Sequence, residues 1–134
     1  MILDTSALLK RYLDEDGTDL VMEQMADDAE WCASALALTE AQITLCHSGL
    51  APALLTQTRA ALRSDWEYLV VVPVDDLCLA RSREIGCAQR IRTLDAIHLA
   101  AAERIPGPAR FLTFDARQRE GAAALGLDVI AVTS

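Results

Sequence analysis

The sequence predicts an α/β fold built on a mostly parallel β-sheet, and two observations support that prediction. Short apolar runs such as "LVVVPV", "RFLTF" and "DVIAV" alternate with longer segments of helical periodicity, which is typical of βαβ units. The apolar runs are continuous, as suits strands that are covered by helices on both faces of a sheet. Functional sites in such sheets gather beyond the carboxyl ends of the strands, so the residues that follow each apolar run are the first candidates.

Strands and helices are expected to alternate from the first residue onwards. Before residue 75 the expected strands cover 1–3, 30–33 and 69–74, and the expected helices cover 6–13, 18–28, 35–49 and 52–69. In the second helix Leu20, Val21 and Met25 recur at helical spacing. Ser34 is expected to cap the third helix, which Gly49 would end.

The second half of the chain repeats the alternation. The expected helices cover 75–86, 92–105 and 115–126, and the expected strands cover 110–114 and 128–132. Asp75 or Asp76 would stand near the start of the first of these helices. The "PGP" segment at 106–108 is expected to stop the second, because proline cannot continue a helix.

Length and composition predict one domain that spans residues 1–134. No run approaches the roughly 20 apolar residues of a membrane-spanning helix. The first residues show no basic region and no cleavable signal pattern, so we expect a cytoplasmic protein with no membrane association. The cysteines form no CxxC pair and are expected to be small core residues rather than zinc ligands; they are Cys32, Cys46, Cys78 and Cys87.

The charge balance limits the classes of partner. Twelve basic and twenty acidic residues give a formal charge of −8, which argues against non-specific nucleic-acid binding over the whole surface. The balance does not exclude a local basic rim, or a site whose acids are neutralised by bound cations. Only His47 and His98 are available, so catalysis centred on histidine is disfavoured.

Two carboxylates follow expected strands directly. Asp4 comes after "MIL" and Asp115 after "RFLTF". If the two strands are neighbours, they lie about 5 Å apart in the sheet, and the two side chains could share one metal ion or two.

Two further acids lie inside apolar helical stretches. On a helix Glu40 would share a face with Leu36, Ile43 and Thr44, and Asp95 would share one with His98 and Leu99. An ionised acid on an inward face needs a partner, because burying it alone costs several kcal/mol. A cluster of such acids is tolerable around a hard cation such as Mg²⁺ or Mn²⁺, which prefers oxygen ligands.

Each acid also has a purely structural interpretation. Asp4 and Asp115 could cap the helices that follow them, Glu40 could face solvent, and Asp95 could stabilise the start of its helix through the helix dipole. Taken singly, these interpretations are at least as good as the functional one. The joint pattern of four acids that one pocket could collect favours a metal site.

The residues around the four acids resemble the PIN domain, in particular the small VapC-type toxins of bacterial toxin–antitoxin pairs. The matching segments are "ILDTSAL" at the start, "LTEAQ" around Glu40, "RTLDAIHLAAA" around Asp95 and "LTFD" ending at Asp115. They occur in the order of the family and extend over the chain. The expected first strand is short, with only three residues before Asp4, and Arg92 stands where the family has a basic residue ahead of the third acid.

The resemblance implies a fold and an activity. The fold would be a PIN-like (Rossmann-like) α/β three-layer sandwich, with a central parallel sheet of about five strands in the order 3-2-1-4-5 and helices on both sides. The activity would be that of an endoribonuclease that depends on one or two Mg²⁺ or Mn²⁺ ions and hydrolyses RNA. The catalytic and metal-binding quartet would be Asp4, Glu40, Asp95 and Asp115, with Glu40 completing the metal shell or orienting the attacking water. The same resemblance implies a cognate VapB-like antitoxin and a homodimer.

Other residues near the quartet are weaker candidates. The hydroxyls of Thr5, Ser6 and Thr113 could orient carboxylates or contact a phosphate, or could serve only in turns and caps. Three basic pairs could form a rim that holds RNA, or could be ordinary surface charges; they are Lys10 and Arg11, Arg90 and Arg92, and Arg117 and Arg119. His98 could bind RNA or relay a proton, although a packed or hydrogen-bonded histidine is the commoner outcome.

Three other classes of enzyme or fold fit less well. An aspartyl-phosphate phosphatase needs a second Asp where this chain has Ser6, and a receiver domain needs a late lysine, whereas the only lysine is Lys10. A dinucleotide-binding fold would need a GxGxxG motif, which is absent. A catalytically silent PIN module that acts through protein or RNA binding stays open as the alternative.

Overall fold

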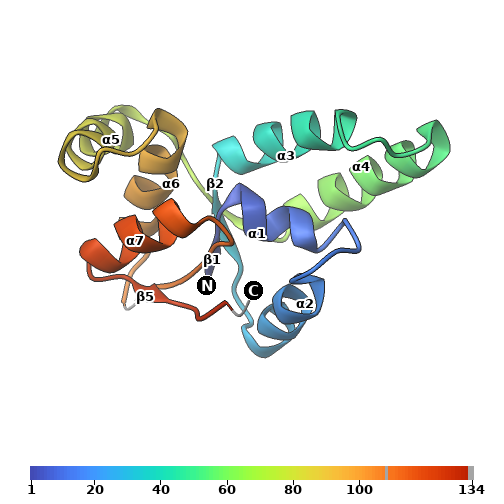
Figure 1. The fold of residues 1–134 in the computed structure, drawn as a ribbon, viewed down its shortest axis with the longest axis horizontal. Coiled ribbons are helices and arrows are strands. Elements are labelled where there is room, and N and C mark those ends of the chain that lie inside the picture. The colour runs from blue at the N-terminus through green and yellow to red at the C-terminus, as the bar shows by residue number, and fades with distance from the viewer. Residues whose placement is uncertain (108, 133–134) are drawn as a thin grey trace.

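The computed structural model describes residues 1–107 and 109–132. The strands are β1 (Ile2–Leu3), β2 (Cys32–Ser34), β3 (Val70–Val72), β4 (Arg110–Leu112) and β5 (Asp128–Val129). The helices are α1 (Thr5–Lys10), α2 (Thr18–Asp27), α3 (Leu36–Cys46), α4 (Pro52–Trp66), α5 (Asp76–Gln89), α6 (Thr93–Glu103) and α7 (Ala116–Ala124). Every expected strand and helix is present, and Figure 1 shows the helices gathered on both sides of the sheet.

The strands form one parallel sheet in the order β3-β2-β1-β4-β5, which confirms the predicted topology. β1 lies between β2 and β4, and its two residues pair with a residue on each side: Ile2 lies opposite Cys32 and Phe111, and Leu3 opposite Ala33 and Leu112. The first strand is therefore central although it is very short. The chain leaves β1 and β4 at the same edge of the sheet.

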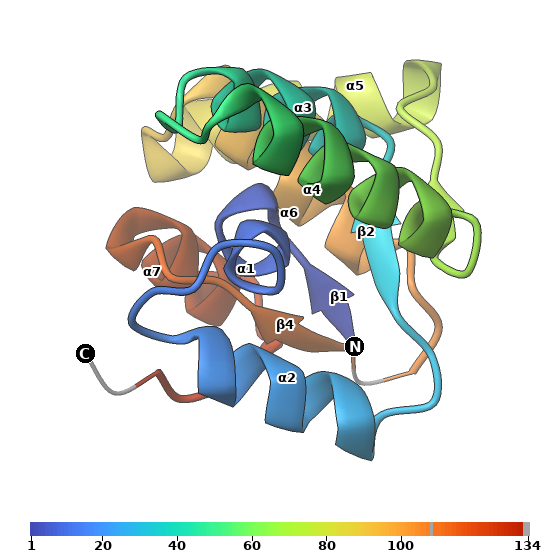
Figure 2. The same cartoon turned by 90° about the vertical axis from the view of Figure 1, so that its right-hand side faces the viewer.

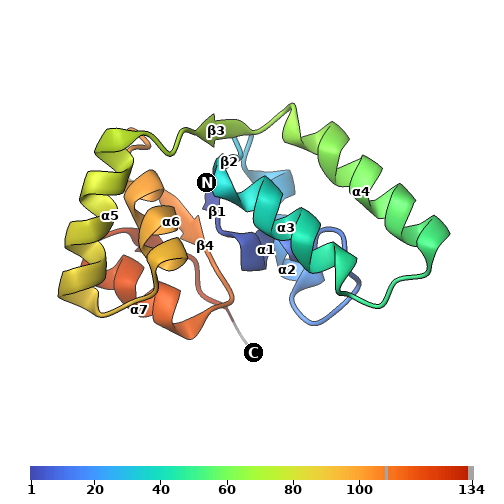
Figure 3. The same ribbon diagram turned by 90° about the horizontal axis from the view of Figure 1, so that it is seen from above.

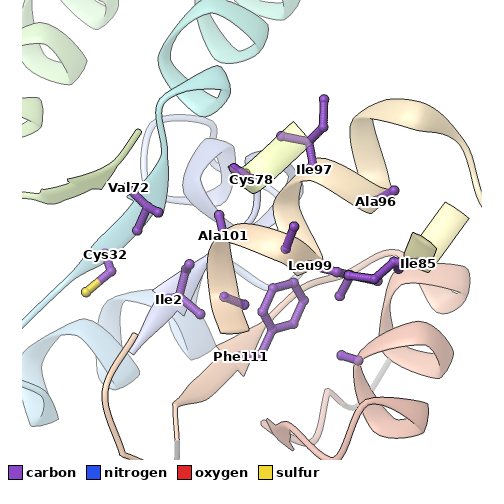
Figure 4. Close-up of a cluster of buried hydrophobic side chains, with 13 residues drawn as sticks. Ile2, Cys32, Val72, Cys78, Ile85, Ala96, Ile97, Leu99, Ala101 and Phe111 are labelled. Atoms are coloured by element: carbon purple, nitrogen blue, oxygen red, sulfur yellow. The ribbon is translucent and has the colours of Figure 1, made fainter. Parts of the chain in front are cut away.

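The two faces of the sheet bury two different sets of helices. Ile2 and Phe111 point into a core that also contains buried residues of α5, α6 and α7 (Figure 4). Leu3 and Leu112 point to the other face and pack with residues of α1 and α2, and Ala33 on that face packs with α3 and α4. Figure 2 shows α1 and α2 beside β1 and β4. Successive residues of each strand point to opposite faces of the sheet, and helices cover both faces. The strands are therefore apolar at every position, which is the pattern that predicted the sheet.

The helices α3 to α7 divide into two groups. Seen from above, α3 and α4 lie side by side and extend away to one side, while α5, α6 and α7 lie on the other (Figure 3). α3 packs through a stripe of small and apolar residues, Ala37, Ala41 and Leu45. Of the described helices, α6 has the longest run of buried residues, because every residue from Ala96 to Ala102 is buried.

Several boundaries differ from those expected from the sequence, for identifiable reasons. β3 ends at Val72, before Pro73, which has no N–H to donate to a neighbouring strand. β4 ends at Leu112 rather than at 114, because the Asp115 N–H turns back to the Thr113 hydroxyl at 3.1 Å. α6 ends at Glu103, ahead of the proline–glycine segment, of which residue 108 lies outside the described residues.

Two specific expectations are wrong. Ser34 is the last residue of β2 and is buried, and the N-cap position of α3 belongs to Ala35; the Ser34 hydroxyl still accepts the N–H of Leu36 at 3.1 Å. Cys46 and Cys87 are exposed rather than buried, because they lie away from the buried stripes of α3 and α5. Among the described residues no helix is long and apolar enough to cross a membrane.

Candidate active site

Asp4 and Asp115 lie where the neighbouring strands β1 and β4 end. Asp4 follows β1 directly, and its N–H donates to the carbonyl of Leu112 at 3.3 Å. Each acid also caps the helix that follows it: Asp4 Oδ1 accepts the N–H of Ala7, and Asp115 Oδ1 accepts the N–H of Gln118, both at 3.0 Å. The capping interpretation is therefore correct for both residues. It does not exclude a metal-binding role, because a carboxylate has a second oxygen and further lone pairs.

Hydroxyl groups tie the ends of β1 and β4 together around Asp4. Ser6 Oγ donates to Asp4 Oδ1 at 2.6 Å, and Thr113 Oγ1 donates to Asp4 Oδ2. The two hydroxyls lie 3.3 Å apart, and Ser6 Oγ accepts the N–H of Phe114 at 2.9 Å. Ser6 and Thr113 thus hold the Asp4 carboxylate in one orientation, as the sequence suggested for residues beside the acids.

The environment of Asp4 opposes its ionisation. The residue is 5 % exposed. Burial raises the pKa of its carboxyl above the ordinary value, although the hydrogen bonds from Ser6, Thr113 and the Ala7 N–H favour the charged form and offset part of this effect. A carboxylate held in this way gains stability from any cation that comes close to it.

Glu40 comes to the site from α3. Its Oε1 accepts the hydroxyl of Thr5 at 2.7 Å and lies 2.5 Å from Nε2 of His98. The Glu40 side chain is 26 % exposed. Ile43 and Thr44, which were expected to share its face of the helix, are exposed, so the expectation that this face points inward is wrong at these two positions. Burial acts to raise the pKa of Glu40, but the hydrogen bonds from His98 and Thr5 outweigh it and lower the pKa below the ordinary value.

Asp95 projects from the first turn of α6 into a pocket of about 260 Å³. The pocket is lined by Arg92, Asp95, Asp115, Ala116 and Arg117. Partial burial raises the pKa of Asp95, and the negative charges of Asp115 and Glu40 raise it further, against the opposing positive charge of Arg92. Within the described residues Asp95 has no hydrogen bond or ion pair, so its carboxylate is available to a ligand.

The six basic residues near the acids divide into two groups. Arg11 donates to Asp65 at 3.1 Å and stacks over the ring of Trp31, and Lys10 pairs with Glu15 at 3.2 Å, so both have local structural partners. The others are not ion-paired with any described carboxylate. Among them Arg92 and Arg117 line the pocket that holds Asp95 and Asp115, and Arg117 continues into an adjoining pocket of about 190 Å³ with Arg90, whereas Arg119 lines neither.

The segment that carries Asp115 is held by a close packing contact. The ring of Phe114 lies against Gly17, at which a Cβ would come within 2.5 Å of Phe114 Cε1. Gly17 has a φ of +97° and stands at the N-cap of α2. The ammonium group of Lys10 lies 5.1 Å from the centre of the same ring. Sequence patterns gave no signal for this contact, because Gly17 and Phe114 are almost one hundred positions apart.

The donor chemistry of these residues fits a hard divalent cation, but the acids do not form a finished cage. Oxygen donors are provided by four carboxylates and several hydroxyls, which is the set that Mg²⁺ and Mn²⁺ prefer. Over residues 1–107 and 109–132, no three His, Cys, Asp or Glu side chains are already arranged to hold an ion. Like charges repel, so carboxylates that share a site are expected to separate until a cation neutralises them.

The fold and the site define a class: an α/β protein with a parallel sheet in the order β3-β2-β1-β4-β5, and with acidic residues that follow β1 and β4 and lie on α3 and α6. Residues 1–124 match the model of the PIN domain, and the chain belongs to this family. The resemblance to the PIN domain, which was inferred from the sequence motifs, is thereby confirmed.

Individual relatives agree with this assignment. The chain is similar to Ribonuclease VapC46 of Mycobacterium tuberculosis, with 33 % identity over 130 residues that cover 96 % of this chain and 95 % of the relative. Its fold is similar to that of a toxin–antitoxin complex from Klebsiella pneumoniae (TM-score 0.71, 14 % identity, 97 % of this chain and 95 % of the other). It is also similar to VapC20 of Mycobacterium tuberculosis, described as a toxin that cleaves the sarcin–ricin loop (TM-score 0.71, 16 % identity, 92 % and 93 %).

Proposed function

We propose that this protein is a metal-dependent endoribonuclease that hydrolyses phosphodiester bonds in RNA and acts as a toxin neutralised by a cognate antitoxin. The observation that carries the proposal is that, in a PIN-domain chain, Asp95 and Asp115 line one pocket and Glu40 lies near enough to raise the pKa of Asp95. Asp4 follows β1, the strand next to β4. The related VapC46 is named a ribonuclease, and a similar fold occurs in a toxin–antitoxin complex.

The four acids are the residues proposed to hold one or two Mg²⁺ or Mn²⁺ ions, directly or through water. A divalent cation bound there would lower the pKa of a water molecule and neutralise charge on the scissile phosphate and the leaving oxygen. The raised pKa values of Asp4 and Asp95 support this assignment, because within the described part of the chain neither carboxyl forms an ion pair that would compensate its negative charge.

The remaining side chains of the site would bind and orient. Ser6 and Thr113 hold the Asp4 carboxylate, and Thr5 and His98 hold that of Glu40. With its lowered pKa Glu40 stays ionised at neutral pH, so its carboxylate can accept a hydrogen bond from the attacking water and orient it. This role needs a fixed acceptor rather than a base of raised pKa.

RNA is proposed to be held at the pocket by Arg92 and Arg117. Both line the pocket that holds Asp95 and Asp115, and both lack a described carboxylate partner. With a net charge of −8 on the chain, attraction of a polyanion must come from such local positive charge and from bound cations. We further propose that the protein acts in the cytoplasm, as one domain over residues 1–134, in a homodimer.

Cleavage of RNA by the full-length chain, purified without antitoxin, tests the proposal directly. Total RNA is incubated with wild type, Asp4→Asn and Asp95→Asn in Mg²⁺, in Mn²⁺ and in EDTA, and Asp14→Asn is the matched control because Asp14 is an exposed acid outside the site. Wild type and Asp14→Asn should cleave only with metal, and the two site variants should lose most of the activity.

Two results would contradict the proposal. Equal cleavage by all four proteins would point to a contaminating nuclease. No cleavage by any of them, on RNA that contains transfer, ribosomal and messenger species, would favour the catalytically silent module that acts only through binding.

A further inference from the structure

His98 lies at the proposed active site but belongs to neither the acids nor the hydroxyls that hold Asp4. It is on α6, one turn after Asp95, and is 3 % exposed. Its Nε2 lies 2.5 Å from Glu40 Oε1 and 3.3 Å from Thr5 Oγ1. An ionised carboxylate can only accept hydrogen bonds, so the hydrogen of this contact must be on Nε2, and His98 is the donor.

The hydrogen bonds to Glu40 converge on one of its two oxygens. Thr5 and His98 both donate to Oε1, and neither contacts Oε2. A Glu side chain on a partly exposed helix face has three rotatable torsions and would otherwise sample several orientations. Two donors on one oxygen fix the carboxylate plane and leave the other oxygen open for a ligand.

The contact also joins parts of the molecule that the fold keeps separate. His98 is on α6, which packs on one face of the sheet, and Glu40 is on α3, which packs with the residues of the other face. Asp95 is on the same helix as His98, so the contact sets the position of Glu40 relative to Asp95. A buried imidazole suits this task because it is rigid and can donate without bringing a fixed positive charge that would compete with a cation.

We propose that His98 is a positioning residue: its Nε2–H holds Glu40 Oε1, so that the Glu40 carboxylate would be oriented to help Asp95 hold a divalent cation. This inference rests on the proposed function. Partners of this kind, one contact removed from the metal, typically change metal affinity by about 10- to 100-fold when they are lost.

Two polar substitutions separate positioning from simple packing. In His98→Gln the side-chain amide can take the place of Nε2 and donate to Glu40, whereas in His98→Asn the shorter amide takes the place of Nδ1 and cannot reach it. His47→Gln is the matched control, because His47 is exposed at the end of α3 and is the only other histidine. Glu40→Gln removes the negative charge of the carboxylate but keeps a carbonyl oxygen as acceptor, and it serves as the positive control for loss of metal binding.

The main measurement is Mn²⁺ binding by isothermal titration calorimetry on the metal-stripped full chain. We expect His98→Asn to bind Mn²⁺ at least about 10-fold more weakly than wild type, His98→Gln to stay within about 3-fold of wild type, and His47→Gln to be unchanged. In cleavage assays with saturating RNA, His98→Asn should lower kcat and leave KM for RNA unchanged. Melting in EDTA verifies that each variant is folded.

A second readout needs neither metal nor activity. Long-range ¹H–¹⁵N spectra of the metal-free chain contain only two histidine rings, and they should show His98 with its proton on Nε2. Glu40→Gln should shift the His98 Nε2 resonance and leave that of His47 unchanged. This spectrum tests the contact itself, even where a His98 variant fails to fold.

The outcomes distinguish this inference from the proposed function. If Glu40→Gln abolishes Mn²⁺ binding while both His98 variants bind Mn²⁺ as wild type does, the positioning role is refuted and the nuclease stands. Equal weakening in His98→Gln and His98→Asn would assign His98 to packing and likewise refute it. If wild type itself neither binds Mn²⁺ nor cleaves RNA, the proposed function fails and the inference fails with it.

Discussion

Replacing Thr113 by Val should destabilise the protein through the buried charge of Asp4. Thr113 is fully buried, donates to Asp4 Oδ2 and accepts the Asp115 N–H at 3.1 Å. Valine has nearly the same shape, so the substitution removes these two hydrogen bonds without leaving a cavity. A hydrogen bond to a charged group contributes about 1.5–3 kcal/mol and a neutral one about 1 kcal/mol, which gives a loss of about 2.5–4 kcal/mol.

The expected loss converts to a change in melting temperature. With an unfolding entropy of about 2.1 cal/mol/K per residue, a chain of 134 residues has about 0.28 kcal/mol/K, so the melting temperature should fall by about 9–14 °C. Chemical denaturation at pH 7.5 in EDTA gives the free energy of unfolding directly. Thr113→Ser is the control, because it keeps the hydroxyl and loses one buried methyl, for which the cost is about 1 kcal/mol.

A double-mutant cycle tests the mechanism rather than the size of the effect. In the Asp4→Asn background both hydrogen bonds of Thr113 are neutral, so Thr113→Val should cost about 2 kcal/mol, which leaves a coupling free energy of about 0.5–2 kcal/mol. If Thr113→Val costs the same in both backgrounds, or no more than Thr113→Ser, Thr113 acts by packing and the argument from the Asp4 carboxylate is wrong.

Three further predictions concern metal, pH and RNA. Mn²⁺ at about 100 times its Kd should stabilise wild type by about 2.7 kcal/mol and Asp95→Asn by less than half as much, as measured by melting with and without EDTA; an equal gain would remove Asp95 from the metal site. Since burial raises the pKa of Asp4, the native state holds the proton more tightly than the unfolded state, so stability in EDTA should fall as pH rises from the ordinary value of 3.8 through the raised pKa; Asp4→Asn should make this decline shallower and leave the part that the raised pKa of Asp95 contributes, and a decline as steep as that of wild type would contradict the prediction. Arg92→Gln and Arg117→Gln should each weaken RNA binding and reduce the slope of log Kd against log salt by about 0.7, whereas Arg63→Gln on α4 should do neither; slopes that match wild type would exclude both arginines from phosphate contact.

The sequence was sufficient for the architecture because its signals were local. Continuous apolar runs and helical spacing predicted every strand and helix, and the segments around Asp4, Glu40, Asp95 and Asp115 predicted the family and the sheet order. Strand ends were less predictable, because they depend on single contacts such as the Thr113 hydroxyl that turns the chain after β4.

The site was less predictable where the contacts of a residue depend on a partner that is far away in the sequence. Arg11 follows Asp4 closely in the sequence, yet Asp65 and Trp31 hold it. His98 lies one turn after Asp95, and that spacing indicated a shared face, but only the packing of α6 near α3 shows that it contacts Glu40. The metal-binding role of the four acids stays a prediction.

The contact between Gly17 and Phe114 makes the geometry of the site depend on a position that bears no side chain. At its φ of +97° any other residue is strained, and a Cβ would collide with the ring of Phe114. Relief of that collision would displace the ring of Phe114, which lies between Thr113 and Asp115 in the sequence. Random mutagenesis screened for loss of function should therefore recover substitutions at Gly17, and these would be mistaken for folding defects unless metal affinity were measured as well.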